Sequence, residues 1–305
     1  MSTPATNSTS SSLFEKLAAC LSYKTDHEHN LAALEHRLQL IKHWGIQPGS
    51  RVLEIGCGQG DFTVALGEAV GPQGRVVAVD PAPLDWGTPD YASARAHVLA
   101  SYVGPRIEFV QADPIDFLAS PTTTDKNFDY IVFGYSIWFF SDPTFLTSML
   151  KEAHKHRRSP TVLIVECSLS VSNIAQVPHL LAALTDNALE SFRGEDSRRN
   201  IRCALSPRQI SEKAADAGWT LRDESFITPL PDQIEGRREV RMATQTPAQS
   251  KRFRADLDKT VGQLPPKVGT MLYTMVDTVV TSLERVEGGL AATRNMDAWV
   301  ARFDA

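Results

Sequence analysis

The sequence lacks the features that mark several classes of protein. Its four cysteines, Cys20, Cys57, Cys167 and Cys203, form no CxxC pair, so we expect neither a disulfide framework nor a zinc site. Scattered free thiols are typical of a reducing compartment, and we expect a cytoplasmic protein. The chain has no run of about 18 apolar residues that could span a membrane. The first residues, MSTPATNSTSSS, contain no apolar segment, so we interpret residues 1–12 as a disordered tail and not as a secretory signal.

An excess of basic residues is also missing. The formal net charge is −5, and 42% of the 305 residues are hydrophobic. Nucleic acids and anionic membranes favour basic surfaces, so neither is an expected partner. The composition is that of a globular protein with a sizeable core, and it leaves the oligomeric state open.

The hydrophobic pattern predicts an α/β fold behind a helical lead-in. Residues 13–47 form that lead-in, because Leu31, Leu34, Leu38 and Ile41 recur at helical steps. From residue 48 onward, expected strands alternate with helices, and the strands are almost entirely apolar: RVLEIG, RVVAVD, RIEFVQAD, FDYIVFGY and TVLIVECSL. Such runs indicate a parallel sheet that helices cover on both faces, a doubly wound arrangement.

The regular alternation ends near residue 172. Two helical inserts are expected, at about 173–205 and 230–296, with a strand at 220–230 and a last strand in DAWVARFDA, residues 297–305. The second insert has an apolar helical stripe that we interpret as core. Its members are Met271, Leu272, Met275, Val276, Val279, Val280, Leu283 and Val286.

Three glycines follow the first expected strand, in the stretch RVLEIGCGQGDF at residues 51–62. Gly56, Gly58 and Gly60 lie where a strand turns into a helix. Glycine permits positive φ and lets a ligand approach the bare backbone, and the N-terminus of the next helix adds partial positive charge. An ordinary tight turn would use the same residues.

Two acidic residues at strand ends favour a ligand site over a plain turn. Asp80 ends the second strand, where a carboxylate can accept hydrogen bonds from the two hydroxyls of a ribose. Asp113 ends the third strand, where it could bind an adenine amino group. Asp113 could instead cap the helix that follows it.

The spacing argues against a dinucleotide. A GxGxxG fingerprint needs glycine at position 61, where this chain has Asp61. Glu54, two residues before the first glycine, would repel a pyrophosphate but suits a ligand that carries an ammonium and a sulfonium. A nicotinamide dehydrogenase is therefore the less favoured interpretation.

The motifs VLEIGCGQG, VVAVD, VQAD and YIVFGYS resemble those of the class I S-adenosylmethionine-dependent methyltransferases. The resemblance covers residues 48–172 well. It implies a Rossmann-like, seven-stranded, mostly parallel sheet with an antiparallel last strand, and S-adenosylmethionine as cofactor. Tyr23 is expected to cover that cofactor. The other contacts that the resemblance implies are Glu54, Gly56, Cys57, Gly58, Gly60, Asp80, Pro81, Ala112, Asp113, Pro114, Tyr135 and Ser136.

Missing motifs narrow the substrate class. The stretch GYSIWFF after the fourth strand contains neither the Asn/Asp-Pro-Pro-aromatic motif of nucleic-acid amino-methyltransferases nor a Pro-Cys nucleophile. The acidic ligands of metal-dependent catechol enzymes are also missing, so we expect no metal. A small-molecule acceptor remains, covered by the two inserts as a lid. Trp138 and Ser168 are candidate acceptor contacts, whereas Phe139 and Phe140 are expected to pack in the core.

Methyl transfer from a sulfonium is a direct displacement that mainly needs alignment and exclusion of water. A base is required only for a weakly acidic hydroxyl or a protonated amine. The candidates are His27, His29 and His36, with Tyr135 near the methyl group. The spacing DHEH also resembles a metal cluster, and ordinary surface or capping histidines are a further interpretation.

The predicted function is thus methylation of a small apolar or aromatic acceptor, at oxygen or nitrogen. A non-methylating relative that binds S-adenosylmethionine and directs a cyclisation has the same motifs, so it remains an alternative.

Overall fold

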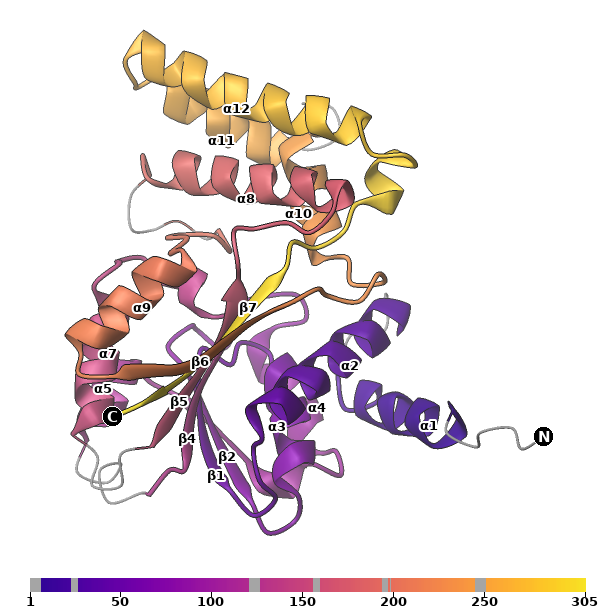
Figure 1. Cartoon of the computed structure of the whole chain (residues 1–305), viewed down its shortest axis with the longest axis vertical. Coiled ribbons are helices and arrows are strands. Elements are labelled where there is room, and N and C mark those ends of the chain that lie inside the picture. The colour runs from indigo at the N-terminus through magenta and orange to yellow at the C-terminus, as the bar shows by residue number, and fades with distance from the viewer. Residues whose placement is uncertain are drawn as a thin grey trace.

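The structure is a computed structural model, in which a central sheet lies below a separate layer of helices (Figure 1). It describes residues 7–22, 27–120, 127–155, 160–193, 197, 199–244 and 251–305, without the side chains of residues 7–11, 251, 252 and 254. Residues 1–6 and Tyr23 lie outside the described residues.

The sheet has seven strands in the order β3-β2-β1-β4-β5-β7-β6. The first five strands in this order are mutually parallel, and β7 is antiparallel to both of its neighbours, β5 and β6. This arrangement confirms the expected mostly parallel sheet with an antiparallel last strand. The strands are β1 (Arg51–Ile55), β2 (Arg75–Asp80), β3 (Ile107–Gln111), β4 (Tyr130–Gly134), β5 (Thr161–Cys167), β6 (Thr220–Ile227) and β7 (Ala298–Asp304).

Helices cover both faces of the sheet, because alternate strand residues point to opposite sides. Val52 packs with the helices of one face and Leu53 with those of the other. The first face carries α1 (Asn7–Ala18), α2 (His27–Trp44), α3 (Asp61–Val70) and α4 (Tyr91–Leu99). The second face carries α5 (Pro114–Ala119), α7 (Phe145–His154) and α9 (Pro207–Asp216). Short 3-10 turns are η1 (Gly104–Arg106), η2 (Ile137–Phe139), η3 (Ile174–Gln176) and η4 (Gly289–Ala292).

The two predicted inserts form one helical bundle with its own core, at the top of Figure 1. Its helices are α8 (Val177–Glu190), α10 (Glu235–Thr244), α11 (Lys251–Val261) and α12 (Pro266–Glu284). Leu272, Val276 and Val279 of α12 are buried in this core, as the apolar stripe predicts. The prediction is wrong for Met271 and Val280, which are exposed, because the bundle covers only part of the stripe.

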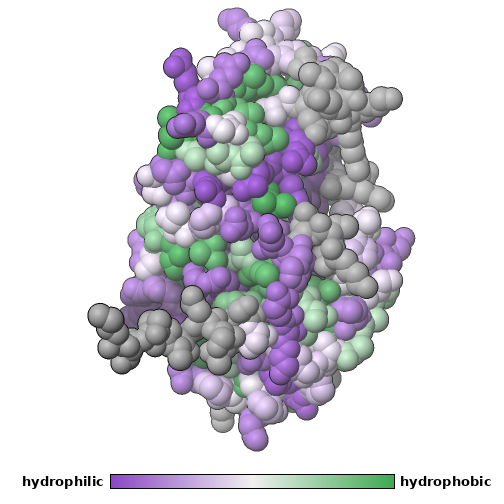
Figure 2. All heavy atoms as spheres, turned by 90° about the vertical axis from the view of Figure 1, so that its right-hand side faces the viewer, coloured by the Kyte–Doolittle hydropathy of each residue, from purple (hydrophilic) through white to green (hydrophobic). Residues whose placement is uncertain are grey.

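The N-terminal prediction needs a correction as well. Helix α1 begins at Asn7, so residues 7–12 are helical and not a disordered tail. Figure 2, which faces the side of α1 and α2, shows hydrophilic and hydrophobic residues interspersed on this surface. No helix within the described ranges is long and apolar enough to cross a membrane.

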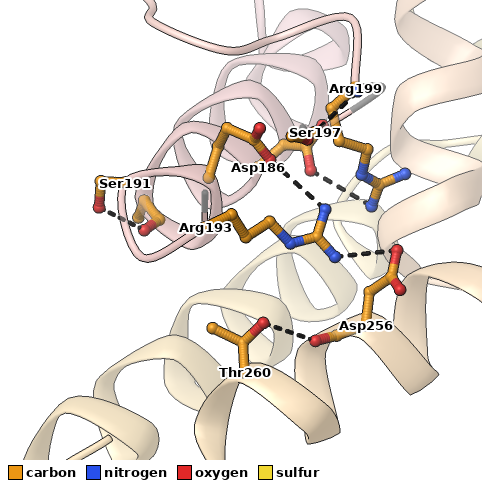
Figure 3. Close-up of polar contacts among 9 residues, drawn as sticks. Asp186, Ser191, Arg193, Ser197, Arg199, Asp256 and Thr260 are labelled. Atoms are coloured by element: carbon orange, nitrogen blue, oxygen red, sulfur yellow. Dashed lines mark hydrogen bonds and ion pairs between the residues drawn. The ribbon is translucent and has the colours of Figure 1, made fainter. Parts of the chain in front are cut away.

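Ion pairs hold the loop after α8 to the rest of the bundle (Figure 3). The guanidinium of Arg193 lies 2.8 Å from Asp256 of α11 and 3.4 Å from Glu190. Arg199 pairs with Asp186 at 3.4 Å and lies over the ring of Phe253. Burial raises the pKa of Asp186 to about 6, and Arg199 opposes that rise. These pairs fix the chain immediately before Asn200 and Ile201.

We predict that Asp256→Asn loosens α11. Arg193 would lose its ion pair with Asp256 and keep the one with Glu190. We therefore expect the free energy of unfolding to fall by about 1 kcal/mol, the scale of a partly exposed ion pair. Chemical denaturation measures this change. Asp277→Asn, on the exposed side of α12, is the matched control. Equal stability of Asp256→Asn and the parent protein would show that the pair contributes nothing.

Candidate active site

A cavity of about 480 Å³ lies at the carboxyl ends of β1, β4 and β5, beneath the helical bundle. The turn after β1 and the end of β5 form its floor, and the segment after β4 forms part of its wall. Residues Trp86, Gly87 and Tyr91 form one side of it. The wall that faces the floor is called the roof. It consists of His179, Gln233, Glu235, Arg238, Glu239, Met242, Asn295 and Met296.

The three glycines of the turn serve two purposes. All have positive φ, at 78°, 53° and 99° for Gly56, Gly58 and Gly60. A Cβ on Gly56 would lie 2.5 Å from the Cβ of Ser136, and one on Gly60 would lie 2.9 Å from Phe109. These two glycines are therefore required by packing. A Cβ on Gly58 would meet only the Tyr91 hydroxyl, at 3.6 Å, so this glycine keeps open a cradle that a ligand can occupy.

Glu54 is a buried acid next to this cradle. It is 1% exposed, and Thr63 Oγ1 donates a hydrogen bond to it at 2.6 Å. Burial raises the pKa of Glu54 to about 8, so the free protein holds a proton here at neutral pH. A bound cation would favour the ionised carboxylate. Glu54 therefore fits the ammonium and sulfonium of S-adenosylmethionine.

Asp80 ties the turn to the neighbouring strand. Its Oδ2 accepts a hydrogen bond from the Gly58 amide at 2.8 Å, and its Oδ1 accepts one from Ala82 at 2.9 Å. The carboxylate thus fixes the conformation of the cradle, while carboxylate oxygens can accept more than one hydrogen bond each. The ribose contact of Asp80 stays a prediction.

The structure shows the capping alternative for Asp113. Its Oδ1 accepts hydrogen bonds from the amides of Ile115 and Asp116 at the start of α5. Asp113 is exposed and does not belong to the cavity lining, nor do its neighbours Ala112 and Pro114. Pro81 likewise lies outside the lining. The adenine contact of Asp113 and the cofactor contacts of Pro81, Ala112 and Pro114 stay predictions.

Tyr135 and His36 meet at the cavity wall. The Tyr135 hydroxyl lies 2.8 Å from His36 Nε2, and Tyr135 has a positive φ of 56°, a conformation rare outside glycine. Burial lowers the pKa of His36 to about 4 and raises the pKa of Tyr135 well above its usual value. Both side chains are therefore neutral at physiological pH. The second ring nitrogen of His36, Nδ1, is buried and has no hydrogen-bond partner among the residues that the structure describes.

The other two candidate bases have different positions. His27 is exposed at the surface and pairs with Glu15 at 3.1 Å, so it lies outside the cavity, as the surface interpretation holds. His29 accepts a hydrogen bond from the Ile234 amide and lies 3.5 Å from Glu235. It does not belong to the cavity lining, and it stabilises the roof through these contacts. The described ranges contain no group of three or more histidine, cysteine, aspartate or glutamate side chains that could hold a metal.

The aromatic run after β4 contributes to the wall. Trp138 is buried, lines the cavity and donates its indole N–H to the Leu205 carbonyl at 3.0 Å. The core prediction is wrong for Phe139, which also lines the cavity and is 49% exposed. Phe140 packs edge to face against Phe133, as predicted.

The end of β5 positions this run. Both oxygens of Glu166 accept backbone hydrogen bonds, Oε2 from Ile137 and Trp138 and Oε1 from Cys167. Burial raises the pKa of Glu166 to about 7. Ser168, a predicted acceptor contact, does not belong to the lining and bonds Ser170 instead.

The residues of the roof were not identified from the sequence. They come from the two inserts, which carry no recognisable motif. His179 Nδ1 accepts the Met296 amide at 2.8 Å, while its Nε2 lies 2.9 Å from Glu239. Only the folded bundle brings these positions, 117 and 60 residues apart, to one wall.

Comparison with known proteins identifies relatives of this chain. Residues 52–159 match a family described as "Methyltransferase domain", and residues 19–84 match one described as "Protein-L-isoaspartate(D-aspartate) O-methyltransferase". Methyltransferase phomM' of Diaporthe leptostromiformis is 29% identical, over 83% of this chain and 73% of its own length. Demethylmenaquinone methyltransferase of Staphylococcus aureus is 28% identical, over 38% of this chain and 45% of its own.

A solved structure shares the whole architecture. A cyclopropane-fatty-acyl-phospholipid synthase-like protein from Lactobacillus casei superposes with a TM-score of 0.76 and 22% identity. The match covers 96% of this chain and 99% of that one, so it includes the helical bundle as well as the sheet.

We predict that Gly58→Val abolishes binding of S-adenosylhomocysteine while the protein stays folded. A branched side chain would fill the cradle and disfavour the positive φ. Titration calorimetry measures the affinity. Gly49→Val is the matched control, because Gly49 has a φ of 87° and nothing within 4 Å of its added Cβ. Unchanged affinity in Gly58→Val would contradict the assignment of the cradle.

We also predict that Glu54 releases a proton when S-adenosylmethionine binds at about pH 7, since a cation lowers a carboxyl pKa. Calorimetry in buffers of different ionisation enthalpy measures the release, which Glu54→Gln should reduce. Identical proton release in both proteins would contradict the assignment.

The raised pKa of Glu54 also predicts how the stability of the free protein depends on pH. Between the two pKa values, the folded state holds a proton that the unfolded chain has lost. The contribution of Glu54 to stability therefore falls as pH rises from 4.5 to about 8, and Glu54→Gln should flatten this fall.

Proposed function

Since the chain belongs to the class I S-adenosylmethionine-dependent methyltransferases, we propose that it methylates a small organic acceptor in the cavity beneath the bundle. It is an S-adenosylmethionine-dependent methyltransferase, and the proposal concerns the acceptor and the residues that serve it. We propose an acceptor with an apolar or aromatic body, methylated at nitrogen or oxygen.

One observation carries this proposal: a single cavity contains both halves of a transfer site. Gly58 and Glu54 lie on its floor, and Trp138 and Phe139 lie on its wall with the residues of the roof. A volume of about 480 Å³ is in the usual range for a small-molecule site. The indole and phenyl rings supply apolar contact area for the acceptor.

When bound, S-adenosylmethionine supplies a methyl group whose bond to sulfur breaks as the bond to the acceptor forms, which leaves a neutral thioether. The protein holds the two partners in line and keeps water out. Glu54 balances the positive charge of the cofactor before the transfer. Glu166 fixes Trp138 through backbone hydrogen bonds, and so it positions the acceptor wall.

We propose that Tyr135 and His36 act as one unit beside the acceptor. Each is neutral, and one hydrogen bond joins them. If the acceptor must lose a proton, Tyr135 can accept a hydrogen bond from it while His36 holds the phenol in place. A pKa of about 4 makes His36 a weak base, so this pair suits an acceptor whose proton leaves during or after the transfer.

The test begins with the cofactor. We predict that Asp80→Ala weakens binding of S-adenosylhomocysteine by about 2–4 kcal/mol, the loss of charge-assisted hydrogen bonds to the ribose and to the turn. Asp129→Ala is the matched control, because Asp129 accepts a backbone hydrogen bond of the same 2.8 Å length at the opposite end of β1. Equal affinities for the two variants would contradict the ribose contact.

The transfer itself is tested with S-adenosylmethionine that carries a deuterated methyl group. The protein is incubated with a panel of apolar amines and phenols, and mass spectrometry follows labelled products and S-adenosylhomocysteine. A labelled product formed together with S-adenosylhomocysteine supports methylation. Conversion of an acceptor without S-adenosylhomocysteine would support the alternative, a non-methylating reaction such as a cyclisation.

A further inference from the structure

The roof carries a carboxylate, that of Glu239, of which one oxygen is hydrogen-bonded to a neighbouring side chain. The backbone amide of Met296 donates to His179 Nδ1, so the proton of the neutral ring must lie on Nε2. That nitrogen faces Glu239 Oε2 at 2.9 Å and therefore donates to it. The other oxygen of Glu239 has no hydrogen-bond partner among the described residues, and Glu239 lines the cavity.

A second acceptor on the same wall receives no hydrogen bond from the part of the chain that the structure describes. This acceptor is Oε1 of Gln233, a side chain that is 4% exposed and lines the cavity. The oxygen is buried and has no hydrogen-bond partner within the described ranges. A buried oxygen without a donor destabilises the folded protein, because it has lost its hydrogen bonds to water and gained none in return. Such an atom at the wall of a cavity points to a ligand that supplies the missing hydrogen.

Acidic side chains outnumber basic ones around the cavity. The carboxyl groups of Glu54, Asp61, Glu166, Glu235 and Glu239 line it, against the guanidiniums of Arg37 and Arg238. Burial raises the pKa of the Cys167 thiol well above its usual value, and the nearby carboxylates of Glu166, Glu239 and Glu235 raise it further. His29 and Asn295 contact Glu235, and Arg37 acts on it electrostatically. Glu239 is held by the uncharged ring of His179. Carboxylates that converge on one cavity repel each other, and a cation between them relieves that repulsion.

Apolar side chains complete the surroundings. Trp138, Ile201, Met242 and Met296 line the cavity together with the acceptors. The expected ligand therefore has an apolar body and one end that carries both positive charge and N–H donors. An alcohol could supply a hydrogen bond but not the charge.

We propose that the methyl acceptor carries an ammonium group, bound by the free oxygen of Glu239 with Gln233 Oε1 as a second hydrogen-bond acceptor. His179 is a positioning residue that keeps the Glu239 carboxylate turned toward the cavity. This inference rests on the proposed function, because it assumes that the cavity binds the acceptor.

The experiment compares two probes of equal shape, 2-phenylethylamine and 2-phenylethanol. Each is titrated by calorimetry into the protein saturated with S-adenosylhomocysteine at neutral pH. We expect the amine to bind about tenfold more tightly or better, since a charge-assisted hydrogen bond is roughly twice as strong as a neutral one. Glu239→Gln should remove this preference and leave the affinity for the alcohol unchanged.

Glu284→Gln is the matched control, because Glu284 is exposed at the end of α12. It should retain the preference for the amine. The affinity for S-adenosylhomocysteine reports whether each variant is folded. If Glu239→Gln does not bind S-adenosylhomocysteine, Gln233→Leu carries the test and should weaken the amine severalfold without affecting the alcohol.

The outcomes separate this inference from the proposed function. Failure of the parent protein to bind S-adenosylhomocysteine would overturn the proposed function itself. Binding of S-adenosylhomocysteine with no preference for the amine, or with neither probe bound, would overturn only the ammonium site. A preference that survives both Glu239→Gln and Gln233→Leu would also overturn it.

Discussion

The close approach of the turn after β1 to its neighbours is the constraint on which the site depends. Gly56 lies so near Ser136 that no side chain fits between β1 and β4, and the Ser136 hydroxyl donates to the Ile55 carbonyl. Asp80 at the end of β2 binds the amide of Gly58. Three strand ends are thus locked together around one loop, and the open side of that loop becomes the floor of the cavity.

The burial of titratable side chains determines the electrostatics of the cavity. Glu54, Glu166 and His36 are almost fully buried. Burial raises the pKa of the two carboxyl groups and lowers the pKa of the imidazole, so each group favours its uncharged form. Electrostatic interactions are stronger in such a site than in water. A cationic ligand that enters the cavity would therefore re-ionise the carboxyls, which couples its binding to proton release.

The roof belongs to a bundle that has its own hydrophobic core. A smaller apolar cluster joins this bundle to the segment after β4: Ala183 of α8 is buried there with Trp138, Ile201 and Met296. His29 of α2 contacts Glu235 from another side. The apolar cluster therefore fixes the bundle above the carboxyl ends of the strands, and the cavity lies between them. An enclosed position of this kind suits a site that must exclude water.

The sequence by itself determined the sheet, because apolar strands and glycine turns are local patterns. It also indicated that Glu54 and Gly58 lie together where β1 ends, and both line the cavity. It also left Asp113 open between a cap and a ligand, and the folded chain shows the cap. Only the tertiary structure decided which histidine faces Tyr135 and that Glu239 lies on the cavity wall. His36 and Tyr135 are 99 residues apart in the sequence, and Glu239 belongs to an insert that has no recognisable motif. Helical periodicity orients a side chain about its own helix, whereas packing between elements decides what that side chain meets.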